Sequence, residues 1–362
     1  MELSPEGSEV HSTTPRTAGY SCVVALPAHP LRIASSLARA RLGRHVPLKV
    51  THLLTYHCNV ECGFCTRIHV PSDHMTRDQT VSMMGSFSRM GTRWWVFNGG
   101  EPTLVNPLGE YIHTGRKLGF NLSMVTNGTR IEHRLDELAE LNLVICSIHG
   151  DEAEHDRVVG REGSYAAAIR GLQMLKRRGV DVCLLCVLND RNRAQMEDLL
   201  RLGEELGAGV AFQPVVETRL GGASIEPSLV PRQRAMAEAV DWLLSEKIAG
   251  RPVSCSKAYL EAIADSWPQR PFGVKCWAGR LFCEVTPEGY VVPCCSEEEY
   301  VAADRHGPTV GWDRAFAALP DRSGCQACWF KGPQELNLLL GLRPKQALRA
   351  ASNLASGRML WD

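Results

Sequence analysis

The chain has 362 residues, 44% of them hydrophobic, and its 40 lysines and arginines balance 40 aspartates and glutamates. This size predicts one large globular domain with a smaller appendage, and the zero net charge excludes a global basic field for nucleic-acid binding. No apolar run approaches the roughly 18 residues that a membrane span needs. Fourteen cysteines, without a secretory signal in residues 1–20, favour metal ligation in the cytoplasm over disulfides.

The first 45 residues are predicted to form a leader and one helix. Residues 1–30 are rich in Ser, Thr, Pro and Gly and lack periodicity. Residues 31–44 have a basic, amphipathic helical pattern. We interpret this as a solvated helix packed on the domain, with contact to a membrane surface or an acidic partner as the alternative.

Three cysteines, Cys58, Cys62 and Cys65, follow the first predicted strand with the spacing Cys-x3-Cys-x2-Cys. Clustered thiolates are soft ligands that suit zinc or iron–sulfur centres. A tetrahedral zinc ion would need a fourth ligand, which His57 or His69 could supply. A [4Fe–4S] cluster held by three cysteines would instead leave one iron open to a substrate or cofactor.

From residue 46 to residue 231 strand-like runs alternate with helical patterns. The predicted strands are Pro47–Tyr56, Arg93–Phe97, Asn121–Thr126, Leu143–Ile148, Asp181–Leu188 and Val210–Gln213. The predicted helices lie near 77–90, 107–118, 132–141, 164–179 and 193–206. Repeated strand–helix units indicate an α/β fold with a parallel sheet, here a partial (β/α)6 TIM-like barrel.

Polar residues end each predicted strand. They include the turn Gly99-Gly100-Glu101-Pro102 after the second strand, Asn127 after the third, and Ser147 with His149 at the fourth. Because chemistry in such barrels sits where strands end and loops begin, we expect the functional site along this rim.

A second cysteine set follows linking helices predicted at 232–275. Its pattern is Cys276, then Gly289-x4-Cys294, then Cys325-x2-Cys328. Residues 280–293 are predicted to form a β-hairpin turning at Gly289, which would bring Cys276 and Cys294 together. Four thiolates suit either a [4Fe–4S] cluster or a zinc ribbon-like site. The domain is assigned to 276–332, and the tail at 333–362 is predicted to be helical.

The cysteine triplet, Phe64 before its last cysteine and the Gly-Gly-Glu-Pro turn resemble, in this order and separation, the radical S-adenosylmethionine (radical SAM) enzymes. The resemblance implies a [4Fe–4S] cluster on Cys58, Cys62 and Cys65 that binds SAM and cleaves it reductively. The resulting 5′-deoxyadenosyl radical would remove a hydrogen atom from a substrate carbon. An electron donor such as flavodoxin or ferredoxin is implied as a partner.

Beside such a core, the second cysteine set resembles the twitch domain, the short form of the SPASM auxiliary-cluster domain. This implies an auxiliary [4Fe–4S] cluster on Cys276, Cys294, Cys325 and Cys328. No cysteine follows Cys328, so one auxiliary cluster is predicted. A cluster with four cysteine ligands would accept an electron from the substrate radical, which favours an oxidoreductase.

The resemblance also implies contacts to SAM. The methionine end would meet Gly99, Gly100, Glu101 and Pro102, and the adenine would meet Phe64. Asn127 and Ser147 are candidates for ribose or carboxylate contacts, although Ser147 could instead bond its own backbone. Arg157 or Arg161 could bind the SAM carboxylate, the alternative being a surface arginine at a helix start.

Three residues are candidates for catalysis. His149 occupies a position where many twitch-domain and SPASM relatives carry Asp. Histidine titrates near neutrality, so it could act as an acid or base, or it could equally donate a hydrogen bond to the substrate. Cys283 and Cys295 could donate a hydrogen atom in a radical epimerase, the alternative being buried small hydrophobic residues.

Peptide-modifying relatives often carry an N-terminal leader-recognition domain, and the roughly 45 residues before the core look too short for one. We therefore expect a small-molecule or carbohydrate-type substrate. Peptide modification and epimerisation are the alternatives among radical enzymes. A zinc-binding scaffold is the non-enzyme alternative.

Overall fold

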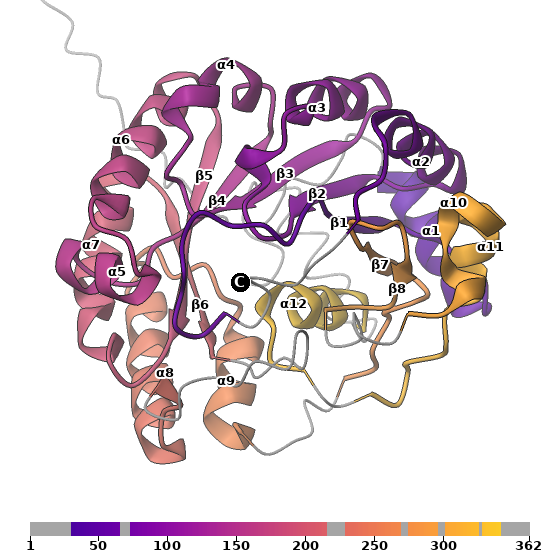
Figure 1. The fold of residues 1–362 in the computed structure, drawn as a ribbon. Coiled ribbons are helices and arrows are strands. Elements are labelled where there is room, and N and C mark those ends of the chain that lie inside the picture. Colours follow the sequence, from indigo (N-terminus) through magenta and orange to yellow (C-terminus); the bar gives the residue numbers. More distant parts are fainter. Residues whose placement is uncertain are drawn as a thin grey trace, which may run out of the picture.

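The computed structural model describes residues 30–65, 73–215, 229–268, 274–295, 301–325 and 328–341. Its centre is one eight-stranded sheet with the order β6-β5-β4-β3-β2-β1-β7-β8. The strands are β1 (Lys49–Leu53), β2 (Trp94–Asn98), β3 (Asn121–Thr126), β4 (Leu143–Ser147), β5 (Asp181–Leu188), β6 (Gly209–Pro214), β7 (Phe282–Val285) and β8 (Val291–Val292). All six strands predicted for the core are present and parallel. The sheet curves into an open arc, which confirms the partial barrel (Figure 1).

Helices cover the outside of this arc (Figure 1). They include α2 (Arg77–Met90), α3 (Leu108–Lys117), α4 (Leu135–Leu138), α5 (Glu152–Val159), α6 (Ser164–Arg177) and α7 (Met196–Leu206). Further helices are α1 (Pro30–Arg41), α8 (Gln233–Ile248), α9 (Lys257–Ser266), α10 (Gly307–Val310), α11 (Trp312–Ala317) and α12 (Lys331–Leu340). The described part of the chain contains no helix that is both long and apolar enough to cross a bilayer.

Local signals in the sequence explain where these helices begin and end. At the start of α2, Thr76 and Gln79 form a capping box, each side chain accepting a hydrogen bond from the other's backbone amide. Gly91 ends the helix in the left-handed region with φ 110°. Helix α5 was not predicted from the sequence, because its eight mostly polar residues make only about two turns and give no clear periodicity.

The main hydrophobic core lies between the sheet and the outer helices. Val50 of β1 is the register partner of Trp95 of β2, and both belong to the same buried cluster as Phe87 of α2. Because side chains alternate along a strand, the neighbouring positions Lys49 and Thr51 face the opposite side, the interior of the barrel. The sheet therefore has an apolar outer layer and a more polar inner face on β1.

The predicted hairpin is present as β7 and β8, which pair antiparallel. Gly289 makes its turn with φ 97°, and its amide donates to the Thr286 carbonyl at 3.0 Å. Strand β7 also pairs in parallel with β1, with Lys49 opposite Phe282. The segments assigned to 46–231 and 276–332 thus share one sheet.

Helix α12 lies on the open side of the arc, between β6 and the β7–β8 hairpin (Figure 1). Its Glu335 accepts a hydrogen bond from the amide of Ser256, the N-cap of α9, at 2.7 Å. Its Asn337 accepts one from the amide of Trp277 at 2.9 Å. The helix therefore joins the linking helices to the second cysteine region. The rest of the predicted helical tail, residues 342–362, lies outside the described residues.

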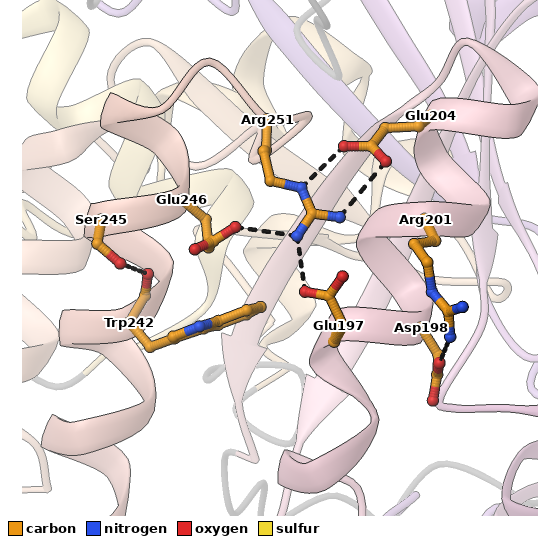
Figure 2. A network of polar contacts seen from close by, with 8 residues as sticks. All are labelled: Glu197, Asp198, Arg201, Glu204, Trp242, Ser245, Glu246 and Arg251. Atoms are coloured by element: carbon orange, nitrogen blue, oxygen red, sulfur yellow. Dashed lines mark hydrogen bonds and ion pairs between the residues drawn. The ribbon is translucent and has the colours of Figure 1, made fainter.

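A charged network joins α7 to the end of α8 (Figure 2). The guanidinium of Arg251 contacts Glu204 at 2.8 Å, Glu197 at 2.6 Å and Glu246 at 2.9 Å. Because the Arg251 side chain is only 20% exposed, these ion pairs are partly shielded from water. The network fixes the linking helices against the last strand–helix unit of the core.

Candidate functional site

The cysteine loop leaves the end of β1 beside the Gly-Gly-Glu-Pro turn that follows β2. The amide of Gly100 donates to the Thr55 carbonyl at 2.6 Å, and the amide of Glu101 donates to the His57 carbonyl at 2.9 Å. A Cβ on Gly100 would lie 2.2 Å from the His57 oxygen, and one on Gly99 would lie 2.3 Å from the Thr55 oxygen. The glycines are therefore required by the close approach of the protein's own cysteine loop. Gly100 can offer a ligand only its carbonyl group, which suits an ammonium donor.

Glu101 is fully buried and joins this turn to β3. One carboxylate oxygen accepts hydrogen bonds from the Thr103 amide at 3.0 Å, the Thr103 hydroxyl at 2.6 Å and the Thr126 hydroxyl at 2.8 Å. The other oxygen accepts from the Asn127 amide at 2.8 Å. Burial raises the pKa of Glu101, and these hydrogen bonds oppose the rise. Pro102, also buried, starts the short 3-10 helix for which Glu101 is the N-cap. The role of Glu101 visible here is to hold two strand ends together.

Asn127 contacts the cysteine loop directly. Its side-chain nitrogen Nδ2 donates to Asn59 Oδ1 at 2.8 Å and lies 3.7 Å from Cys58 Sγ. Its side-chain oxygen accepts from both the amide and the hydroxyl of Thr129, at 3.0 and 2.7 Å. These protein contacts occupy the side chain that the sequence analysis assigned to ribose or carboxylate binding. Asn59 and Thr129 were missed there, although a polar residue adjoining a candidate ligand cysteine was an available signal.

The cysteine loop also rests on the C-terminal end of α5. The amides of Glu61 and Gly63 donate to the carbonyls of Val159 and Val158, at 2.9 and 3.1 Å. Arg161 donates to the Asn59 carbonyl at 3.0 Å. Helix α5 therefore supports the loop, and the signal for it was the N-cap Asp151 with the C-cap Gly160.

Of the two arginines considered for the SAM carboxylate, Arg161 holds the loop backbone and Arg157 lies at the surface. The Arg157 side chain is 62% exposed and pairs with the buried carboxylate of Glu154 on the same helix. This geometry corresponds to the surface-arginine alternative for Arg157. Ser147 occupies the predicted strand end, opposite Leu185 of β5.

The three thiols of the loop are electrostatic neighbours. Burial raises the pKa of Cys62, and the nearby Cys65 and Cys58 raise it further. Three buried thiolates this close together would repel one another. A positively charged metal centre would stabilise them, because it deprotonates its cysteine ligands. Within the described residues, no three Cys, His, Asp or Glu side chains converge tightly on one point. The ligands of a [4Fe–4S] cluster bind different irons, so they need not converge in this way.

Phe64, which belongs to the cysteine loop, contacts His149 at the end of β4. Their rings meet edge to face, with centroids 5.0 Å apart, and His149 stacks on His155 at 5.7 Å. His149 Nδ1 lies 3.4 Å from the Val187 amide, which donates to it. Burial, helped by His155, lowers the pKa of His149 to about 3. The expectation that His149 titrates near neutrality is therefore wrong, because the buried ring stays neutral at physiological pH.

The second cysteine set is brought together in part. Cys276 and Cys294 pack against the same buried cluster near Trp277, and Cys325 is an electrostatic neighbour of Cys276. Cys328 begins the segment that leads into α12, where its carbonyl accepts a hydrogen bond from Gln334 at 2.7 Å. These contacts group Cys276, Cys294 and Cys325 near the base of the β7–β8 hairpin.

The two candidate hydrogen-atom donors lie on different sides of the sheet. Cys283 is opposite Val50 in the register of β7 and β1, and both belong to the core beneath the outer helices. It therefore faces away from the barrel interior, as the buried-hydrophobe alternative predicted. Cys295 follows β8, is 7% exposed, and lies close enough to Lys49 to influence its pKa. Because Lys49 faces the barrel interior, Cys295 lies near the interior, whereas Cys283 does not.

Comparisons with known proteins agree with this geometry. Residues 53–203 match the family model described as the Radical SAM superfamily. The chain is similar to the crystal structure of Streptococcus suis SuiB bound to S-adenosylmethionine, with a TM-score of 0.60 and 14% identity, over 75% of this chain and 70% of that one. SuiB bound to its precursor peptide SuiA gives a TM-score of 0.62 and 14% identity, over 78% and 69%.

Native anSMEcpe with bound AdoMet is a further similar structure. It gives a TM-score of 0.55 and 19% identity, over 69% of this chain and 75% of that one. At these identities the similarity to SuiB and anSMEcpe establishes a shared fold. The candidate site lies on this fold where the strands of the matched region end.

Proposed function

We propose that this chain, a member of the radical SAM superfamily through its residues 53–203, is an oxidoreductase that uses SAM to start a radical reaction on a polar substrate. When bound, the [4Fe–4S] cluster and SAM supply a 5′-deoxyadenosyl radical that removes a hydrogen atom from a substrate carbon. Cys58, Cys62 and Cys65 would hold this cluster, and the carbonyl of Gly100 would accept a hydrogen bond from an ammonium group. The observation that carries the proposal is the cysteine loop, fixed at the end of β1 by Gly100, Glu101 and α5.

The experiment is an assay of 5′-deoxyadenosine formation from SAM with dithionite, on anaerobically reconstituted protein. We expect the product with the unaltered chain and none with Cys58→Ala. The matched control is Cys255→Ser, because serine can keep the hydrogen bonds that the buried Cys255 thiol makes with the backbone of Phe212. Unaltered product formation in Cys58→Ala, or a colourless protein that contains only zinc, would overturn the proposal.

We further propose an auxiliary [4Fe–4S] cluster held by Cys276, Cys294, Cys325 and Cys328, which would take the electron from the substrate radical. The grouping of Cys276 with Cys294 and Cys325 supports it. We expect about eight irons per chain, falling to about four in Cys276→Ala, which should still form deoxyadenosine. Four irons in both proteins would exclude the auxiliary cluster. An electron donor such as flavodoxin or ferredoxin would reduce the first cluster.

The interior of the barrel supports a substrate with hydroxyl or charged groups. Thr51 of β1 lies opposite Glu284 of β7 on one side and Val96 of β2 on the other. Val96 in turn lies opposite Ser123 of β3, so Glu284, Thr51 and Ser123 share one row across the sheet. All three polar side chains are buried, and their strand neighbours pack in the outer core, so they face the interior. On an inner barrel face such groups would hydrogen-bond a small polar substrate, including a carbohydrate.

A peptide substrate is the second candidate. It is favoured by the structural neighbours, since SuiB is seen with the precursor peptide SuiA and anSMEcpe with the Kp18Cys peptide. The discriminating measurement is the rate of deoxyadenosine formation with a panel of sugars and polyols against a panel of Ser- and Cys-containing peptides. Stimulation by the sugars or polyols supports the first candidate, whereas stimulation by peptides alone supports the second. An epimerase would instead incorporate solvent deuterium into its product, in a reaction that Cys295→Ala abolishes.

A further inference from the structure

The contact between Asn127 and Cys58 links the end of β3 to the first cysteine of the loop. Asn127 Nδ2 lies 3.7 Å from Cys58 Sγ, a separation within the range for a hydrogen bond to sulfur. The two residues are 69 positions apart in the chain, so only the fold brings them together.

The orientation of the Asn127 amide follows from its partners. Its oxygen accepts from the backbone amide of Thr129, a group that can only donate. The nitrogen must therefore face Asn59 and Cys58. One of its two N–H groups goes to Asn59 Oδ1, which leaves the other for the sulfur.

A closed ring of hydrogen bonds holds this amide in place. Asn127 donates to Asn59, Asn59 donates to the Thr129 hydroxyl at 2.9 Å, and that hydroxyl donates back to the Asn127 oxygen at 2.7 Å. The backbone amide of Asn127 is held by the buried Glu101 carboxylate. Because both the side chain and the backbone are fixed, the N–H group aimed at Cys58 is preorganised.

We propose that Asn127 is a positioning residue that donates a hydrogen bond to the Cys58 thiolate and thereby raises the reduction potential of the cluster on this loop. The inference rests on the proposed function, which provides the cluster. An N–H donor stabilises negative charge on a ligand sulfur, and reduction adds negative charge to the cluster. Losing the donor therefore makes reduction harder and lowers the potential.

The test is the midpoint potential of this cluster, followed by EPR during a redox titration of the reconstituted protein. Cys276→Ala serves as the background, so that one cluster dominates the signal. Asn127→Leu has a similar size and no donor, and Asn127→Asp keeps the acceptor for Thr129 but cannot donate. We expect a lower midpoint in both. Thr129→Val is the matched control: it removes the hydroxyl, but the Thr129 amide and Asn59 still orient the Asn127 side chain, so the midpoint should stay close to that of the background protein.

A midpoint in Asn127→Leu equal to that of Thr129→Val and of the background would overturn the inference alone. A protein without any reducible cluster would overturn the proposed function and the inference together. Should Asn127→Leu fail to retain the cluster, protein labelled with ¹⁵N in asparagine side chains provides the second measurement. Pulsed EPR of the reduced cluster should then show a ¹⁵N coupling, and its absence would overturn the inference.

Discussion

Glu101 accepts a hydrogen bond from the backbone amide of Asn127 at 2.8 Å, joining the turn after β2 to the end of β3 beneath the cysteine loop. The same buried carboxylate accepts three further hydrogen bonds, all from the threonines Thr103 and Thr126. These contacts explain the acidic residue in this turn, because in the described structure its carboxylate is met by hydroxyl and amide donors instead of a basic side chain. The contact also means that the position of Asn127 depends on Glu101.

Replacing Glu101 with glutamine should destabilise the protein. A glutamine amide replaces one of the two carboxylate oxygens with an NH2 group, which then faces either the Thr103 amide or the Asn127 amide, so at least one buried donor loses its acceptor. We expect a loss of about 1–3 kcal/mol in the free energy of unfolding, the usual cost of an unmet buried hydrogen bond. Urea unfolding of the metal-free protein measures it. Glu132→Gln, at an exposed position, is the control and should change the free energy by less than about 0.5 kcal/mol.

Replacing Gly100 with alanine should prevent the cysteine loop from docking. The new Cβ would lie 2.2 Å from the His57 carbonyl oxygen, a backbone atom that cannot move without displacing Cys58. We expect loss of iron binding together with lower stability, measured by iron content and by urea unfolding. Gly119→Ala is the control, because φ there is +74° but no described atom lies within 4 Å of the added Cβ. It should cost about 1–2 kcal/mol and keep the iron. Normal iron content in Gly100→Ala would contradict the steric explanation.

Acid should destabilise the fold through its buried histidines. Burial lowers the pKa of His52 and His149 to about 3, and that of His155 to about 4. Between these values and the ordinary pKa of about 6.5, the unfolded chain binds more protons than the folded one, so stability falls as pH falls. Each histidine should contribute a loss of about 2 kcal/mol between pH 7 and pH 5.

The variant that tests this is His52→Leu, because His52 lies among Trp95, Phe97 and Tyr111, and its Nδ1 has no hydrogen-bond partner in the described structure. Urea unfolding at pH 5, 6 and 7 should show a shallower dependence on pH than in the unaltered chain. An unchanged slope would show that His52 is protonated equally in both states.

Replacing Arg251 with methionine should weaken the attachment of α8 to α7. Glu197, Glu204 and Glu246 would then repel one another without a cation between them (Figure 2). We expect a loss of at least about 1 kcal/mol in the free energy of unfolding, decreasing at high salt. Arg234→Met is the control, since Arg234 is 90% exposed and its pair with Glu238 should contribute less than about 0.5 kcal/mol. Equal losses in the two variants would contradict a special role for the network.

The sequence by itself determined the succession of strands and helices in the core, the two cysteine sets and the turn beside the first of them. Strand and helix periodicity are local, and the spacing of Cys58, Cys62 and Cys65 within one loop is local as well, so both can be read without a structure. The hairpin at 280–293 was predictable for the same reason, because Gly289 marks its turn.

Only the tertiary structure decided what these residues contact. Asn127 was expected to face a ligand and instead binds Asn59 and Thr129, and His149 was expected to titrate but is buried and neutral. Cys283 and Cys295 looked equivalent until the register of β7 with β1 assigned Cys283 to the outer core. Burial, register and contacts between residues distant in the chain arise from packing of the whole sheet and its helices, so no local pattern of residues encodes them.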